Sequence, residues 1–195
     1  MGDERRKALV FDCFGVMVGE IYGAIRREVP EIAPDIEAMI EADTAVDLGK
    51  KSDKWRQAKY VEIIDGVGKS GEEVVRRANR VAVRDEVLMG KIKEWRREYK
   101  IGVLSNTGRM PFERYFSEEE RREYFDEVVL SYEEGIMKPD RRIFEIVVER
   151  LGVRAEDVVF VDDREENVGV ARNLGMRGVV YKFGEVERVE EVIGG

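Results

Sequence analysis

The sequence contains no histidine and one cysteine among its 195 residues. Without histidine, the chain cannot form a Ser-His-Asp triad, a Cys-His pair or a histidine-ligated zinc site. The single cysteine, Cys13, excludes an intrachain disulfide and agrees with a reducing compartment. A cysteine-dependent phosphatase would place an arginine after five intervening residues, where this chain has Gly19. We therefore interpret Cys13 as a small apolar residue packed beside a strand.

Long apolar runs and an excess of positive charge are also missing. No run of the 43% apolar residues is long enough to span a bilayer, and 42 acidic against 34 basic residues give a net charge of -8. This charge disfavours binding to nucleic-acid phosphates. The N-terminus lacks the apolar segment of a signal peptide, and Arg6 replaces the Ser or Thr of a myristoylation site. We expect a cytoplasmic protein that binds neither membrane nor nucleic acid; the sequence gives no signal for its oligomeric state.

Short, β-branched runs predict the strands of the fold. They occupy residues 7–11, 100–105, 126–131, 157–161 and 177–181. Their almost continuous apolar character is typical of strands buried on both faces. Helical patterns separate the last four runs, as in residues 139–152, where apolar side chains form one stripe. This alternation predicts an α/β fold with a Rossmann-like parallel sheet of five strands. The low glutamine content and the abundance of Glu, Lys and Arg are typical of thermophile proteins.

The interval between the first two strands, about 90 residues, is too long for a single crossover. Its periodicity predicts helices over residues 18–29, 34–47, 52–64 and 71–99, the last broken near 83–85. We infer a helical cap at residues 17–83, with residues 1–16 and 84–195 forming the core. Residues 66–71, GVGKSG, resemble phosphate-binding glycine motifs, but they follow a helix-like stretch and are interpreted as a loop.

Polar residues follow the predicted strands at their carboxyl ends. They are Asp12, Ser105, Asn106, Thr107, Lys138, Asp162 and Asp163. Each alone has an ordinary explanation as a turn residue, a loop charge or a helix cap. Because ligands of parallel α/β sheets bind at this edge, we expect these side chains to lie close together. Carboxylates suit Mg²⁺, and an ammonium and a hydroxyl suit the oxygens of a transferring phosphoryl group.

Four of these stretches carry a family resemblance. FDCFGV, VLSNT, MKPDRRIFE and VFVDDREENVGVARNLGM resemble the four motifs of the haloacid dehalogenase (HAD) superfamily, and their spacing covers nearly the whole chain. The fourth stretch is similar to the subgroup with small helical caps, which includes the phosphatase domain of soluble epoxide hydrolase and bacterial sugar-phosphate phosphatases. The resemblance implies an HAD-like hydrolase, favoured here as a magnesium-dependent phosphatase of a small phosphorylated metabolite.

The resemblance also implies roles for individual residues. Asp12 would attack phosphorus and form an aspartyl-phosphate, while Lys138 would neutralise the nucleophile and the phosphoryl group. The magnesium ligands would be Asp12, the backbone carbonyl of Phe14, Asp163 and, directly or through water, Asp162. The phosphate-binding residues would be Ser105, Asn106 and Thr107. The helical cap would close over the substrate, exclude water and select the leaving group.

Phe14 departs from the phosphatase pattern. Family phosphatases usually carry a second aspartate at this position, which protonates the leaving group and is worth about two to four orders of magnitude in rate. Haloacid dehalogenases place an aromatic residue there, so a 2-haloacid dehalogenase is the first alternative; the acidic pair that follows the fourth strand argues against it. A binding protein without turnover is the second alternative. A cap residue could replace the missing acid, and the candidates are Glu20, Tyr22, Asp53 and Lys54.

Overall fold

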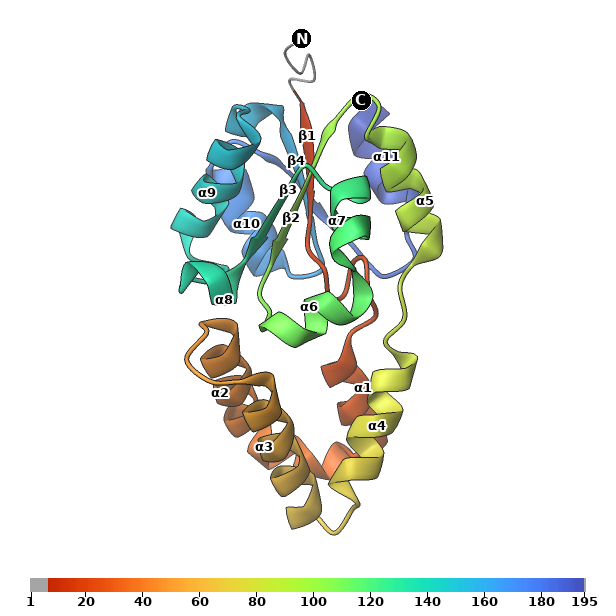
Figure 1. Ribbon diagram of the computed structural model, residues 1–195, viewed down its shortest axis with the longest axis vertical. Coiled ribbons are helices and arrows are strands. Elements are labelled where there is room, and N and C mark those ends of the chain that lie inside the picture. Colours follow the sequence, from red (N-terminus) through yellow and green to blue (C-terminus); the bar gives the residue numbers. More distant parts are fainter. Residues whose placement is uncertain (1–6, 195) are drawn as a thin grey trace.

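The computed structural model describes residues 7–194 and contains one parallel sheet of five strands in the order β3-β2-β1-β4-β5 (Figure 1). The strands are β1 (Ala8–Phe11), β2 (Lys100–Ser105), β3 (Glu127–Leu130), β4 (Val158–Asp162) and β5 (Arg177–Val180). The predicted α/β fold and its five-stranded parallel sheet are confirmed. The third strand ends one residue earlier than expected, because Ser131 begins a helix. The expectations for Arg6 and for the ends of the predicted core, 1–6 and 195, lie outside the described residues.

Helices cover both faces of the sheet (Figure 1). They are α5 (Glu86–Trp95), α6 (Arg109–Tyr115), α7 (Glu118–Tyr124), α8 (Ser131–Glu134), α9 (Arg141–Leu151), α10 (Glu165–Asn173) and α11 (Glu187–Gly194), with a 3-10 turn at Ala155–Asp157. Strand β1 contributes alternate residues to two cores: Leu9 and Phe11 pack in one hydrophobic cluster, Ala8 and Val10 in the other. Both faces of β1 are therefore buried, which fixes the position of the residue that follows it.

The long interval folds as helices beneath the carboxyl ends of the strands (Figure 1). They are α1 (Ile21–Glu28), the 3-10 helix Pro30–Asp35, α2 (Ile36–Asp47), α3 (Asp53–Gly66) and α4 (Gly71–Val81). Their apolar residues form a third hydrophobic cluster that contains no residue of the sheet. The break expected near residues 83–85 is present, because α4 ends at Val81 and the Asp85 carboxylate accepts hydrogen bonds from the first turn of α5.

Two linkers join these helices to the sheet, and they run side by side. The amide of Gly19 donates to the carbonyl of Val83 at 3.0 Å, and the amide of Asp85 donates to the carbonyl of Met17 at 2.9 Å. Backbone hydrogen bonds thus hold the exit and the return of the chain together at a single point.

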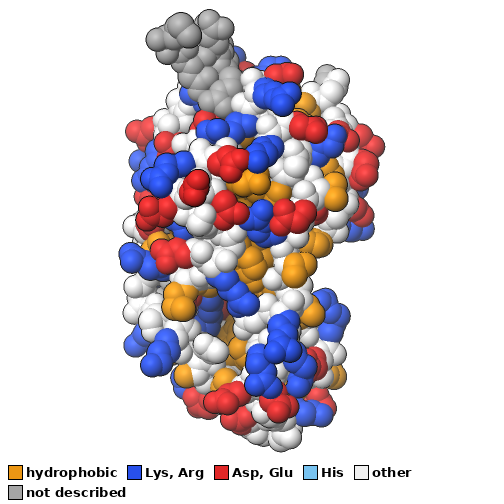
Figure 2. All heavy atoms as spheres, turned by 45° about the vertical axis from the view of Figure 1, so that its right-hand side comes forward, with side chains coloured by type: hydrophobic (Ala, Val, Ile, Leu, Met, Phe, Trp, Pro, Cys, Tyr) orange, Lys and Arg blue, Asp and Glu red, His pale blue; other side chains and the backbone are white. Residues whose placement is uncertain are grey.

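The surface is strongly charged. On the face in Figure 2, basic and acidic side chains are interspersed, and hydrophobic side chains gather at the waist between the two parts of the molecule. Across residues 7–194, every helix is either too short or too polar to cross a membrane.

Candidate active site

Asp12 lies directly after β1 and is almost completely buried, with 7% of its surface exposed. Its amide donates to the carbonyl of Val161 in β4 at 2.8 Å, so the pairing of the two strands extends to this residue. The amide of Cys13 donates to Asp12 Oδ1 at 2.7 Å and orients the carboxylate. Burial raises the pKa of the Cys13 thiol, with the Asp12 charge adding to it, in keeping with the packing role expected for this residue.

Lys138 is fully buried between two carboxylates. Its Nζ lies 3.0 Å from Asp12 Oδ1 and 2.7 Å from Asp162 Oδ2, and it donates to the carbonyl of Leu104 at 2.8 Å. Asn106 fixes its backbone: Nδ2 of Asn106 donates to the Lys138 carbonyl and Oδ1 accepts from the Lys138 amide, both at 2.8 Å. Asp162 and the Leu104 carbonyl therefore hold the ammonium beside the carboxylate of Asp12, and Asn106 fixes the backbone that carries it.

Three carboxylates meet at this point. One oxygen each from Asp12, Asp162 and Asp163 lies within 4.8 Å of the others. Asp162 is held by Asn167, whose Nδ2 donates to both of its oxygens at 3.0 and 3.1 Å. Asn167 lies within the fourth motif but was not among the expected site residues; its position one helical turn into α10 is the signal that indicates it.

Burial opposes the ionisation of Asp12 and Asp163. Burial raises the pKa of Asp12 to about 6, against the opposing charge of Lys138. Asp163 is partly exposed at the surface, yet desolvation of its carboxylate by the surrounding protein raises its pKa to about 7. The charges of Asp12 and Asp162 add to this increase. Burial opposes the charge of Lys138, but Asp12 and Asp162 outweigh it and hold the pKa of the ammonium above its usual value. The site is thus short of positive charge.

The residues fit a magnesium ion. Hard carboxylate oxygens converge there, only one buried cation balances them, and none of the hydrogen bonds found among residues 7–194 reaches the backbone carbonyl of Phe14. The turn before the cluster is also built for close approach: Gly15 has φ +88°, and a Cβ there would lie 2.5 Å from Asp163 Oδ2. These observations support Asp12, Phe14 and Asp163 as ligands, with Asp162 nearby.

Magnesium should stabilise the protein more at high pH than at low pH. Burial raises the pKa values of Asp12 and Asp163 to about 6 and about 7, so the folded protein keeps protons that the unfolded chain releases at about pH 4. The metal-free protein therefore loses stability as pH rises from about 4 to about 7, and above that range both carboxylates are charged and free to bind metal. Below pH 5 protons occupy both groups and compete with the metal. We expect a melting temperature increase of roughly 5–10 °C at pH 8 with metal at about a hundredfold its Kd, and little at pH 5. Asp163→Asn should remove most of the increase; an equal increase at both pH values would contradict the metal assignment.

Gly15 offers a second test. Gly15→Ala should raise the magnesium concentration for half-maximal effect by about tenfold, because its Cβ would displace the Asp163 carboxylate. Gly135→Ala is the matched control, since it has a similar φ of +69° but no atom within 4 Å of the added Cβ. Both variants should lose about 1 kcal/mol of stability from backbone strain. Identical magnesium titrations would show that the approach to Asp163 does not matter.

The predicted phosphate-binding residues differ in what they offer. Ser105 is fully buried at the end of β2, and its Oγ has no hydrogen-bond partner. The side chain of Asn106 holds Lys138, as described above. Thr107 donates its hydroxyl to the Gly108 carbonyl at 3.0 Å and its amide to Ser131 Oγ at 3.0 Å. Ser105 therefore presents the free hydroxyl, whereas the donors of Thr107 support the loop.

Phe14 packs against an aromatic side chain at the edge of the core. Its ring meets Tyr115 of α6 edge-on, with the centroids 6.0 Å apart, and belongs to the rim of the core.

The four cap residues that could replace the missing acid differ in their surroundings. The carboxylate of Glu20 accepts from the Gly23 amide at 2.9 Å, and Asp53 accepts from the Met110 amide at 3.1 Å. Lys54 is exposed, and the hydroxyl of Tyr22 is buried without a hydrogen-bond partner.

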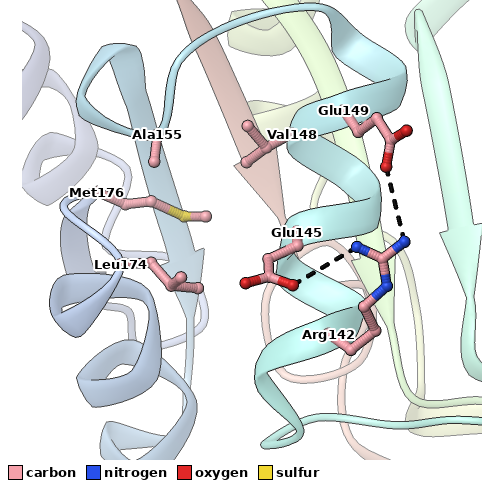
Figure 3. Close-up of a pocket in the computed structure, with 7 residues that line it drawn as sticks. All are labelled: Arg142, Glu145, Val148, Glu149, Ala155, Leu174 and Met176. Carbon is pink, nitrogen blue, oxygen red and sulfur yellow. Dashed lines mark hydrogen bonds and ion pairs between the residues drawn. The ribbon is translucent and has the colours of Figure 1, made fainter.

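A separate hollow lies between α9 and α10, away from these residues (Figure 3). Arg142 runs along α9 and pairs with Glu145 at 3.5 Å and Glu149 at 3.7 Å, while Leu174 and Met176 line the opposite wall. Its charged groups pair with one another, and no nucleophile is present among the residues that line it. The chemistry lies at the strand ends instead.

Known proteins share this architecture. The chain is 40% identical over 86 residues to drimenol cyclase drtB of Aspergillus calidoustus, covering 44% of this chain and 16% of the relative. It is 28% identical over 101 residues to glyceraldehyde 3-phosphate phosphatase of Methanocaldococcus jannaschii, covering 51% and 36%. A magnesium complex of the HAD family enzyme bt-2542 from Bacteroides thetaiotaomicron superposes with a TM-score of 0.71 at 25% identity, covering 93% and 96%.

The chain thus spans little more than a third, or less, of the length of the curated relatives that it matches first. Solved dehalogenases at 18–19% identity show the same fold. The family model of the haloacid dehalogenase-like hydrolases matches residues 6–175. Four motifs, a five-stranded parallel sheet and this match lead to one assignment: the chain belongs to the haloacid dehalogenase-like hydrolases.

Proposed function

We propose that the protein is a magnesium-dependent phosphatase that acts on a small phosphorylated metabolite through a phosphorylated Asp12. The observation that carries this proposal is the buried Lys138, which bridges Asp12 and Asp162 beside the third carboxylate of the cluster. A buried ammonium at the nucleophile suits a substrate that brings several negative oxygens to the site. The phosphatase among the relatives and the magnesium complex among the solved structures support the same chemistry.

In this reaction the Asp12 carboxylate attacks phosphorus, a new P–O bond forms and the bond to the leaving group breaks. Water then attacks phosphorus, releases inorganic phosphate and regenerates Asp12. Lys138 offsets the negative charge of the nucleophile and the phosphoryl oxygens, and the free Ser105 hydroxyl donates to one of them. Magnesium, held by Asp12, Asp163 and the Phe14 carbonyl with Asp162 nearby, would supply further positive charge to these oxygens.

Residues 17–83 serve as the cap in this proposal, and residues 1–16 and 84–195 as the core. Support comes from the separate hydrophobic cluster of α1 to α4 and from the paired linkers. The cap also contacts the core beside residues 105–108, here called the phosphate loop: Asp53 of α3 accepts a hydrogen bond from the amide of Met110, at the start of α6. The cytoplasmic location and the absence of nucleic-acid and membrane partners remain part of the proposal. The single cysteine supports the location, the net charge of -8 disfavours nucleic acid, and the lack of a long apolar run disfavours a membrane partner.

The second candidate is a 2-haloacid dehalogenase, which the aromatic Phe14 favours. A halide leaves without a proton, so the missing acid would not matter. The cluster of Asp12, Asp162 and Asp163 argues against it, because the reaction needs no metal. A binding protein that retains the fold without turnover is the third candidate.

A substrate screen distinguishes the three. Phosphorylated metabolites, aryl phosphates and 2-haloacids are incubated with the protein in excess magnesium or in EDTA. We expect phosphate release in magnesium alone. Halide release in EDTA would replace the phosphatase by a dehalogenase, and magnesium binding without any turnover would favour the binding protein.

A further inference from the structure

The proposed reaction lacks a proton donor on the nucleophile loop, because Phe14 stands where an acid is usual. In-line displacement at phosphorus places the leaving oxygen on the side opposite Asp12. That side faces the helices beneath the strand ends (Figure 1). A donor for the leaving oxygen is therefore to be sought on α1 to α4.

Asp47, the last residue of α2, lies where the helices meet the phosphate loop. Its neighbour Val46 contacts the loop closely, since a Cβ on Gly108 would lie 2.6 Å from Val46 Cγ1. Gly108 directly follows Thr107. Asp47 itself is 8% exposed, and its buried Oδ1 accepts no hydrogen bond, with Arg56 Nη1 as a loose ion-pair partner at 3.7 Å. A buried carboxylate oxygen without a hydrogen bond, on a helix that contacts this loop, points to a ligand group that completes it.

The surroundings of Asp47 favour its protonated form, so that a proton is available on this carboxylate near neutral pH. Burial raises its pKa to about 7, against Arg56, whose Nη1 lies 3.7 Å from Asp47 Oδ1. The charges of Asp43, Asp53 and the nucleophile Asp12 add to the increase. Arg56 does not pair with Asp47 alone, because its Nη2 pairs with Asp53 at 2.9 Å. Asp43 has a different partner, since the Tyr60 hydroxyl donates to it at 2.7 Å.

We propose that Asp47 is the acid that protonates the leaving oxygen, replacing the aspartate absent at position 14. As the P–O bond to Asp12 forms and the bond to the leaving group breaks, the Asp47 proton passes to the leaving oxygen. The Asp47 carboxylate then accepts a proton from the water that attacks the phosphorylated Asp12. Asp47 ends protonated, so the cycle consumes one water and needs no other co-reactant. This inference rests on the proposed phosphatase function.

The other cap candidates are less suited. Glu20 is exposed and caps α1, and Asp53 is engaged by Arg56 and by the amide of Met110. The hydroxyl of Tyr22 is buried and unpartnered, but burial raises its pKa above the usual 10, so it is a weak proton donor near pH 7. Among these groups Asp47 combines a carboxylate without a hydrogen bond and a pKa near neutrality.

The test compares an alkyl with an aryl phosphate, because only the alkoxide needs a proton to leave. Turnover of glycerol 3-phosphate and of 4-nitrophenyl phosphate is measured in saturating magnesium as a function of pH. In the parent, alkyl turnover should fall as pH rises through about 7, where Asp47 loses its proton. Asp47→Asn should lower alkyl turnover by about a hundredfold or more, change aryl turnover less than about threefold and abolish this decline.

Asp43→Asn is the matched control, since Asp43 lies on the same helix and beside the same arginine but hydrogen-bonds to Tyr60. It should keep the alkyl-to-aryl ratio and the pH decline, and Asp47→Glu should retain part of both. Equal losses on the two substrates, an unchanged ratio in Asp47→Asn, or a parent that hydrolyses only the aryl phosphate would each overturn the assignment of Asp47. A parent that hydrolyses neither would instead refute the phosphatase function.

Discussion

Replacing Asp12 with asparagine is expected to reduce phosphate release at least about a thousandfold, because the amide cannot attack phosphorus. The substitution preserves shape, and the Asn side chain can still accept the hydrogen bond from the Cys13 amide. The measurement is steady-state turnover of an aryl phosphate in saturating magnesium. An aryl substrate is chosen because its leaving group needs no acid, so the loss reports the nucleophile alone.

The fold of this variant should remain intact. Asp12 is a buried carboxylate with a pKa of about 6, so its charge is unfavourable in the folded protein at neutral pH. The melting temperature of Asp12→Asn without metal should therefore equal or exceed that of the parent. Turnover within a few-fold of the parent, in a folded variant, would remove Asp12 from the role of nucleophile.

Lys138→Met is the second change with a large expected effect. It leaves the Asp12 and Asp162 carboxylates without their cation, and breaking a buried ion pair in this way costs about 3–5 kcal/mol of stability. Turnover should also collapse, because the charge that offsets the nucleophile and the phosphoryl group is gone. Added magnesium should restore part of the stability, since it supplies positive charge to the same carboxylates. Chemical denaturation with and without magnesium measures both effects.

Lys93→Met is the control for this variant. Lys93 pairs with Glu123 on the surface at 2.5 Å, and exposed pairs contribute about 1 kcal/mol or less. Its loss should change neither turnover nor the response to magnesium. If the two lysine variants lose similar stability, Lys138 does not hold the charge balance of the site.

The sequence predicted the parts of the molecule that follow from local chemistry. Strands buried on both faces, such as β1 and β4, require continuous apolar runs, and residues at the carboxyl ends of parallel strands must meet at one edge. This is why the sequence alone predicts that Asp12, Lys138 and Asp162 lie close together. The same reasoning found the break before α5, where a helix-capping Asp85 interrupts the pattern.

What sequence reasoning missed depends on contacts between distant segments. The side chain of Asn106 is occupied by the backbone of Lys138, 32 residues away, while phosphate binding by the Asn106 amide stays a prediction. Asp47 carries no motif and lies on a helix with an ordinary pattern; the approach of α2 to the loop after β2, and the Tyr60 hydrogen bond to Asp43, distinguish it from Asp43. Packing decides which of several similar acidic side chains lacks a hydrogen-bond partner. The spacing of residues in the sequence does not reveal this packing.

The paired linkers give the chain a modular organisation. Because Gly19 and Val83 already share a hydrogen bond, the ends of the whole helical segment lie no farther apart than the ends of a tight turn. The chain can therefore be joined directly across residues 19 and 83 without disturbing the sheet and its two cores, at the small entropic cost of closing a short loop. Segments of very different length and shape can be exchanged at this point while the nucleophile stays where β1 and β4 hold it. The specificity of a hydrolase of this fold can thus change through exchange of a segment whose removal breaks no strand of the sheet.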